Sequence, residues 1–181
     1  MAGARSPIVD RPAVPSVYGV PSDRKGFLTW TDVARRLAEA RVYWVATSGQ
    51  GTREGRPRIR PVDGNVVDGV LYLTGSPESS WVRDLMANTQ VAVHIDGTAD
   101  VVILEGDAEH IARAAPGQAE RIAAASVAKY PEYGETVDNF RGPGLFAIRP
   151  RVVVAWKAFP RDVTRFRFQA GAYPPARRSR S

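Results

Sequence analysis

The sequence predicts a mainly β protein with inserted helices, folded as an antiparallel barrel of about six strands. Several segments rich in β-branched and aromatic residues are separated by turns that contain glycine or proline, as is typical of strands. The pair Asp68-Gly69 stands between apolar flanks, which favours a two-residue β-hairpin. Only two or three segments have helical periodicity, so the strands do not alternate regularly with helices as they would in a parallel sheet.

The elements are expected in the following order. A helix is predicted within residues 28–41 (LTWTDVARRLAEAR), with Thr31 as its N-cap and with Val33 and Leu37 on its buried face. Two more helices are expected, one starting near residue 80 and one over residues 116–130. Residues 131–144 are expected to form a loop. Strands are predicted at residues 42–48, 56–64, 66–74 (as a hairpin), 89–96, 99–111, 145–157 and 164–168.

The chain of 181 residues is long enough for one domain with a substantial core. Residues 1–26 are rich in proline and glycine and are expected to form an extended N-terminal arm, followed by the barrel domain at 27–168. Residues 169–181 are expected to be a disordered basic tail. No apolar run is long enough to span a bilayer, and no signal-peptide core is present, so no membrane partner is predicted.

The composition narrows the classes of function. The absence of cysteine excludes disulfides and thiolate metal sites and makes a cytoplasmic location the default, and two histidines are too few for a histidine-built metal site. The net charge is +6, but three of these charges are Arg177, Arg178 and Arg180 in the tail. Because no nucleic-acid-binding motif accompanies the charge, a nucleic-acid partner is not predicted. An anionic small molecule explains the remaining charge equally well.

Two segments could carry chemistry. Arg56, Arg58 and Arg60 recur with period two and therefore share one face of a strand. They form either a solvated edge, blunted by the neighbouring prolines, or a wall against which an anionic ligand lies.

The second segment is the loop and helix start at residues 74–83 (TGSPESSWVR). A strand that leads through such a loop into a helix gathers free backbone N–H groups, which attract phosphate. The alternative is ordinary helix capping by serine, with Glu78 favourable to the helix dipole. Trp81 either packs on the barrel or stacks on a bound ring.

In their combined order, these segments resemble the pyridoxamine 5′-phosphate oxidase-like proteins, the flavin and deazaflavin oxidoreductases with a split β-barrel fold. The resemblance runs from about residue 27 to residue 168, through ARVYWVAT, GRPRIRPV, DGVLYLTG, VRDLMANTQVAVHI, VVILEG and RPRVVVAWKAFPRDVTRFRF. It implies a homodimer that binds FMN or the deazaflavin F-420 at the subunit interface. It also implies hydride transfer between that cofactor and an unsaturated small organic substrate.

The resemblance also implies which residues bind the cofactor. They fall in three groups: the strand against the ring, the loop that holds the phosphate, and residues that approach from the partner chain. The first group is Arg58, Arg60, Pro61 and Val62; the second is Thr74, Gly75, Ser76, Ser79, Ser80 and Arg83; the third is Trp156 and Arg165.

One departure from the family pattern affects the phosphate loop. Family members carry several basic residues in this loop. Here Arg83 is the one basic residue, because Ser79 and Trp81 stand where basic residues are usual. Each lost charge-assisted hydrogen bond costs about 1.5–3 kcal/mol of binding free energy. Three outcomes fit: an exchangeable cofactor, compensation by Arg58, Arg60 or Arg83, or a non-redox barrel that has lost its flavin phosphate site and binds another small molecule.

No catalytic triad, P-loop or dinucleotide fingerprint is present, so a bound cofactor would carry the reaction. Tyr43, Tyr72 and Lys157 are candidate proton donors, and the sequence does not choose among them.

Overall fold

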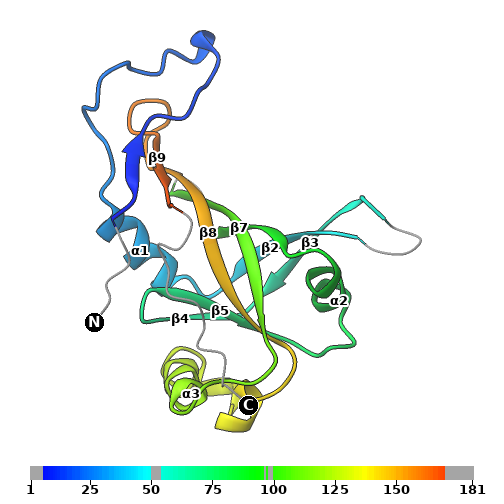
Figure 1. Ribbon diagram of the computed structural model, residues 1–181. Coiled ribbons are helices and arrows are strands. Elements are labelled where there is room, and N and C mark those ends of the chain that lie inside the picture. Colours follow the sequence, from blue (N-terminus) through cyan, green and yellow to red (C-terminus); the bar gives the residue numbers. More distant parts are fainter. Residues whose placement is uncertain (1–5, 50–53, 96, 98–99, 170–181) are drawn as a thin grey trace.

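The computed structural model describes residues 6–49, 54–95, 97 and 100–169. They form nine strands and three α-helices, with short 3₁₀ helices between them (Figure 1). The strands are β1 (Ile8–Asp10), β2 (Tyr43–Ser48), β3 (Pro57–Val62), β4 (Gly64–Val67), β5 (Val70–Thr74), β6 (Gln90–Ile95), β7 (Val101–Ile111), β8 (Leu145–Trp156) and β9 (Thr164–Arg167). The helices are η1 (Ser16–Tyr18), α1 (Trp30–Glu39), α2 (Ser80–Ala87), α3 (Gln118–Lys129), η3 (Pro131–Tyr133) and η4 (Val137–Phe140).

The strands form one antiparallel sheet that curls but does not close. Its hydrogen-bonded order is β1-β9-β8-β7-β6-β2-β3, and β5 joins β4 to the first part of β8. β3 and β4 follow each other with only Asp63 between them and do not pair with each other. The sheet is therefore consistent with a split barrel. β1, which was not expected, and the two separate strands of the β4–β5 hairpin raise the count above the six or so expected.

The β4–β5 hairpin has the turn that the sequence predicts. Asp68 has φ 52° and Gly69 has φ 78°, so both central residues are left-handed, as a type I′ turn requires. The predicted N-cap of α1 was wrong. Thr29 Oγ1, not that of Thr31, accepts the Asp32 N–H at 3.2 Å, because the helix begins earlier, at Trp30.

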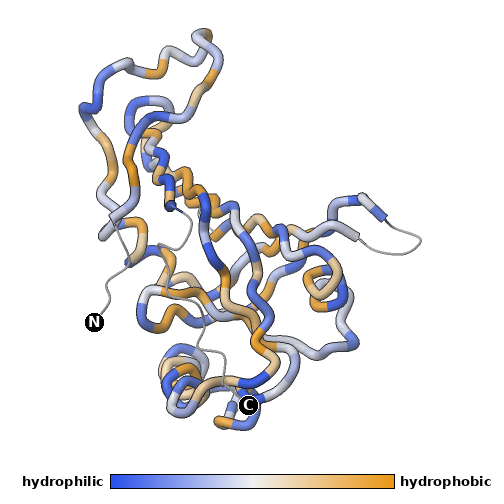
Figure 2. The backbone as a smooth tube through the Cα atoms, in the orientation of Figure 1, coloured by the Kyte–Doolittle hydropathy of each residue, from blue (hydrophilic) through white to orange (hydrophobic). Residues whose placement is uncertain are grey.

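The main core lies inside the curled sheet, where α1 and α2 cover it. Its largest fully buried side chains include Tyr43, Leu73, Leu85, Phe146 and Phe166. A smaller cluster packs α3 against β5 and β8 around Ile122 and Phe140. Figure 2 shows hydrophobic residues running through the sheet, while the β2–β3 hairpin becomes hydrophilic toward its tip. Among the described residues, none of the helices is long and apolar enough to cross a membrane.

The N-terminal arm is attached to the far end of the sheet, where it projects beside the loop between β8 and β9 (Figure 1). Its strand β1 pairs with β9, and Arg11 donates hydrogen bonds to the carbonyls of Asp23, Lys25 and Val163. Arg11 therefore connects residues 23–25, near the end of the arm, to Val163, which precedes β9. The predicted basic tail lies outside the described residues, apart from Gln169.

Candidate functional site

A polar cavity of about 230 Å³ lies where β3 passes into β4. Three residues of the predicted cofactor set, Pro61, Val62 and Thr74, line it. α2 contributes Trp81, and α3 with the segment after it covers the opposite side. The lining is completed by Asp63, Asn65, Tyr72, Ser126, Glu135 and Phe140. The structure thus brings the predicted ring strand and the end of β5 together at one hollow.

The cavity contains an unsatisfied hydrogen-bonding group. Asn65 is only 5% exposed, and its Oδ1 has no hydrogen-bond partner. Leaving a buried amide unpaired costs about 1–3 kcal/mol of folding free energy. The other buried polar groups of the lining are paired, since Ser126 donates to Glu135 and Gln118 Nε2 donates to the Tyr72 hydroxyl at 3.3 Å. Asn65 is therefore suited to a ligand that carries an N–H or O–H donor.

The arginines of β3 are not a row of free charges. Arg58 Nη1 lies 3.1 Å from Asp84 Oδ2 of α2, and their side chains are only 14% and 3% exposed. Thr47 Oγ1 donates to the same carboxylate oxygen at 2.8 Å. Arg60 is exposed, and its Nη1 donates to the Ile59 carbonyl at 2.7 Å. Of the two predicted arginines, Arg58 has its charge offset by Asp84, and Arg60 keeps the more accessible charge.

The loop before α2 is held mainly by its own serines. The Ser76 carbonyl accepts from the N–H and the hydroxyl of Ser79, at 2.9 and 2.7 Å, and the Ser76 hydroxyl accepts from the Glu78 N–H. Ser79 is the N-cap of α2, yet its side chain makes no capping bond, so the capping interpretation of this serine is not what the structure shows. The first N–H groups of α2, beginning at Ser80, have no intrahelical acceptor. Arg83 Nη1 donates to the Glu78 carbonyl beside them.

Trp81 packs on the barrel, which was one of its two interpretations. It is 8% exposed, and its ring centroid lies 6.0 Å from that of Phe146. A Cβ atom added to Gly75 would lie 2.4 Å from Trp81 Cζ2, and one added to Gly144 would lie 1.7 Å from the Gly75 oxygen. Glycine at 75 is thus required for the indole to form the wall of the cavity.

Trp156 and Arg165 lie elsewhere. Trp156 is in β8, with its ring centroid 5.6 Å from that of Phe159. Arg165 is in β9 and donates to both carboxylate oxygens of Asp10, at 2.7 and 3.1 Å. Neither residue lines the polar cavity of its own chain.

Of the three candidate proton donors, only Tyr72 lines the polar cavity. Tyr43 is fully buried, donates to the Leu37 carbonyl at 2.6 Å, and has its pKa raised by burial. Lys157 forms an ion pair with Asp32 at 3.1 Å.

Sequence reasoning missed Asn65, Asp63, Ser126 and Glu135 as lining residues. Asp63 lay within a predicted strand and Asn65 fell between two predicted strands, and neither residue belonged to a motif. Ser126 and Glu135 come from a helix and a loop more than 50 residues further along the chain, so only the fold reveals that they meet β4.

No protein-family model matches the chain, and no curated protein matches it in sequence. Solved structures do match its fold. A conserved hypothetical protein from Mycobacterium tuberculosis has a TM-score of 0.61 at 19% identity, over 76% of this chain and 90% of that one. A heme binding protein from Mycobacterium smegmatis has a TM-score of 0.60 at 20% identity, over 74% of this chain and 56% of that one. An FAD-binding protein from Mesorhizobium loti has a TM-score of 0.52 at 19% identity, over 78% and 96%.

At these identities the likeness shows the fold alone. The chain has the fold of a group of proteins that includes binders of FAD and of heme, and its open antiparallel sheet is consistent with the split-barrel type.

Proposed function

We propose that the protein is an oxidoreductase that binds a flavin-type cofactor, FMN or F-420, and transfers hydride to an unsaturated small organic substrate. The polar cavity beside Pro61, Val62 and Thr74, with its unpartnered Asn65, is the observation that carries this proposal. The FAD-binding protein of the same fold supports a flavin, and so does the resemblance of the sequence segments to flavin and deazaflavin enzymes.

The lining suits the polar edge of a flavin-type ring. That edge carries an N–H donor next to carbonyl acceptors, and Asn65 would accept from the donor while its amide nitrogen meets a carbonyl. Pro61 and Val62 would lie along the ring, with Trp81 closing the cavity behind it. Satisfying Asn65 would remove the penalty that it imposes on the free protein.

The phosphate would bind at the start of α2, next to the cavity. Thr74 lines the cavity and leads into the loop of Ser76 and Ser79, which is followed by the uncapped N–H groups of α2. Arg83 donates to the Glu78 carbonyl of the same loop. Arg60 would add a second accessible charge, whereas Arg58 would contribute little because Asp84 holds it. Because the phosphate would meet few accessible positive charges, we expect the cofactor to exchange with solution.

A bound flavin or deazaflavin supplies the hydride chemistry. The protein's own residues would orient the ring through Asn65 and exclude water with Trp81 and Phe140. Tyr72, whose hydroxyl accepts from Gln118, is the candidate proton donor that lines the cavity and from which a substrate could take a proton.

The proposal includes a homodimer. Trp156 and Arg165 do not reach the cavity of their own chain, so they could serve it only from a second subunit. Ile59 of β3 and Met86 of α2 are apolar, and they are 52% and 54% exposed. These two exposed apolar residues are proposed contacts with the partner.

The test is titration of the purified protein with FMN and with F-420, followed by fluorescence, for the natural sequence and for Asn65→Leu. The natural protein is expected to bind at least one cofactor below millimolar concentration. Asn65→Leu should bind at least about tenfold more weakly and yet melt at a higher temperature, because an unpaired buried amide is replaced by an apolar side chain. Weaker binding with higher stability cannot arise from unfolding. Failure of both cofactors to bind would contradict the proposal.

A second candidate function is a non-redox small-molecule-binding barrel. The Arg58–Asp84 ion pair favours it, since it neutralises a charge that a flavin phosphate could use. Such a protein would stay colourless after incubation with either cofactor, and Asn65→Leu would then change stability alone.

A heme site is less well supported. His110 Nε2 lies 2.8 Å from the Pro143 carbonyl, and its ring packs at a tilt against Phe146 with a centroid distance of 5.4 Å. His110 is thus engaged within the protein. The same titration with hemin, read at the Soret band, separates this case from flavin binding.

A further inference from the structure

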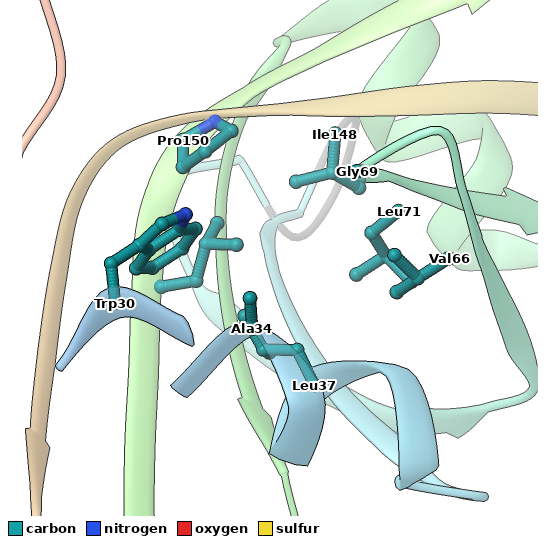
Figure 3. A pocket seen from close by; sticks show the side chains of 9 residues that line it. Trp30, Ala34, Leu37, Val66, Gly69, Leu71, Ile148 and Pro150 are labelled. Atoms are coloured by element: carbon teal, nitrogen blue, oxygen red, sulfur yellow. The ribbon is translucent and has the colours of Figure 1, made fainter. Parts of the chain in front are cut away.

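A second cavity, of about 100 Å³, lies between α1 and the sheet (Figure 3). α1 contributes Trp30, Ala34 and Leu37 to one wall, and the β4–β5 hairpin and β8 form the other. The residues of the second wall are Val66, Gly69, Leu71, Ile148 and Pro150, and Leu104 of β7 completes the lining. We name this space the α1 cavity.

The β4–β5 hairpin separates the two cavities. Asn65 pairs with Tyr72 across the two strands, and both line the polar cavity. The next pair, Val66 and Leu71, lines the α1 cavity. Because successive side chains of a strand point to opposite faces, the two spaces lie on opposite faces of the same hairpin. A ligand in the α1 cavity would therefore not occupy the proposed flavin site.

The side chains that line the α1 cavity are apolar, apart from the indole N–H of Trp30. A water molecule needs two to four polar partners to stay in a protein interior. Here it would find at most one side-chain donor, so the space favours a hydrocarbon surface over water. This is the opposite chemistry from the polar cavity, which contains Asp63, Asn65 and Glu135.

The protein cannot easily fill the α1 cavity with its own side chains. The Trp30 ring is held by Phe166 and Phe168, at centroid distances of 5.5 and 4.9 Å, so it forms a wall and does not swing inward. Opposite the sheet, Ala34 offers only a methyl group (Figure 3). Leu71, Leu104 and Ile148 are buried in the main core, which fixes their positions.

The volume of the α1 cavity and its opening to solvent limit the size and the chemical class of the ligand that it could bind. An apolar cavity of about 150 Å³ holds benzene in an engineered protein. The α1 cavity is smaller, but Gly69 is exposed and Trp30, Ala34 and Val66 are only partly buried, so it opens to solvent. We infer that the α1 cavity is a binding site for a small apolar molecule or group, one aromatic ring or a branched chain of similar size, with any polar end left in water.

The test uses benzene as the probe, with the full chain, by isothermal titration calorimetry. The natural protein is expected to bind benzene with a dissociation constant in the millimolar range. Ala34→Leu should weaken binding by at least about tenfold, because the longer side chain fills the space. Ala38→Leu is the matched control: Ala38 lies in the same helix but is exposed, and this variant should bind as the natural protein does.

A second variant acts in the opposite direction and does not depend on the folding of Ala34→Leu. Val66→Ala enlarges the cavity at its partly exposed side and should shift the preference from benzene toward p-xylene. Saturating FMN should leave benzene binding unchanged. Absence of benzene binding to the natural protein would overturn the inference, as would binding that neither Ala34→Leu nor Val66→Ala alters. Failure of the flavin proposal would leave the result unaffected, since the two cavities are separate.

Discussion

Arg58 of β3 and Asp84 of α2 form an ion pair, 3.1 Å between Nη1 and Oδ2, that is almost completely withdrawn from solvent. It fastens α2 to the strand that lines the polar cavity. The sequence predicts Arg58 on a strand, but it does not predict the ion pair, because Asp84 lies 26 positions further along the chain.

The first prediction concerns this pair. Asp84→Asn should lower the free energy of unfolding by about 3–5 kcal/mol, because it leaves a buried guanidinium without a counter-charge. Urea unfolding measures the change. Arg56→Gln, at an exposed position next to β3, is the control and should stay within about 0.5 kcal/mol of the natural protein. The double variant Arg58→Met with Asp84→Leu should recover much of the loss. Equal stability of Asp84→Asn and the natural protein would mean that the pair is not formed in solution.

The second prediction concerns Gly75. Gly75→Ala should cost about 1–3 kcal/mol of stability, because the added Cβ falls 2.4 Å from Trp81 Cζ2 and the indole must move. The displaced indole should also reduce FMN binding, measured by titration. Gly142→Ala is the matched control, since no atom lies within 4 Å of its added Cβ. An unchanged melting temperature for Gly75→Ala would show that Trp81 has room to move.

The third prediction concerns pH. Burial, with the positive charge of Arg41 nearby, lowers the pKa of Lys129 from 10.5 to about 8. Its Nζ donates to Tyr43 Oη at 3.0 Å and to the Gly64 carbonyl at 2.9 Å, but burial dominates. Above pH 8 the folded protein releases this proton while the unfolded chain keeps it, so stability should rise with pH up to about 10.

Thermal melting between pH 8 and pH 10 measures this effect. This pH range lies below the one in which ionisation of the tyrosines changes stability. Burial raises the pKa of Tyr43, and that of Tyr130 to about 12, so above pH 10 both groups act in the opposite direction. The rise should disappear in Lys129→Met and persist in Lys25→Met, because Lys25 is an exposed lysine of the arm. A rise that survives in Lys129→Met would assign the effect to another group.

The fourth prediction concerns the arm. Hydrogen bonds from Arg165, and then from Arg167, hold the pKa of Asp10 below its ordinary value of 3.8. The stabilisation of the folded protein by ionised Asp10 is therefore complete above pH 3.8. It is lost only as the pH falls through the lowered pKa of Asp10. Asp10→Asn should loosen the arm at neutral pH and speed tryptic cleavage at Arg24 and Lys25, followed by mass spectrometry. Glu54→Gln, which removes an exposed carboxylate outside the arm, is the control and should be cleaved at the natural rate.

The local parts of the fold were predictable. The Asp68-Gly69 turn needs left-handed backbone at two positions, and a short pattern encodes it. The long strands β7 and β8 and the three helices also follow from periodicity. β1 was not predictable, because it forms only when Ile8–Asp10 meets β9 and lies in a segment rich in proline.

The candidate site was predictable only along β3 and β5. Pro61, Val62 and Thr74, three of the cofactor-binding residues that the resemblance implies, line the cavity, while Trp156 and Arg165 do not line it within one chain. Asn65 could not be found from sequence, since its significance is a missing hydrogen bond, which is a property of the packed structure. Serine capping of α2 was one of the two interpretations of its first residues, and in the structure the Ser79 hydroxyl donates to the Ser76 carbonyl in the loop instead.

The two prolines of β3 limit how another polypeptide could extend the sheet. β3 ends the hydrogen-bonded order, with Pro57 opposite Ser48 and Pro61 opposite Trp44 in the register with β2. Proline has no N–H to offer, so a foreign strand laid along this border would find gaps in the ladder of donors. These gaps disfavour amyloid-like stacking along β3. Another polypeptide would therefore have to bind this edge through its side chains, by complementary shape and charge.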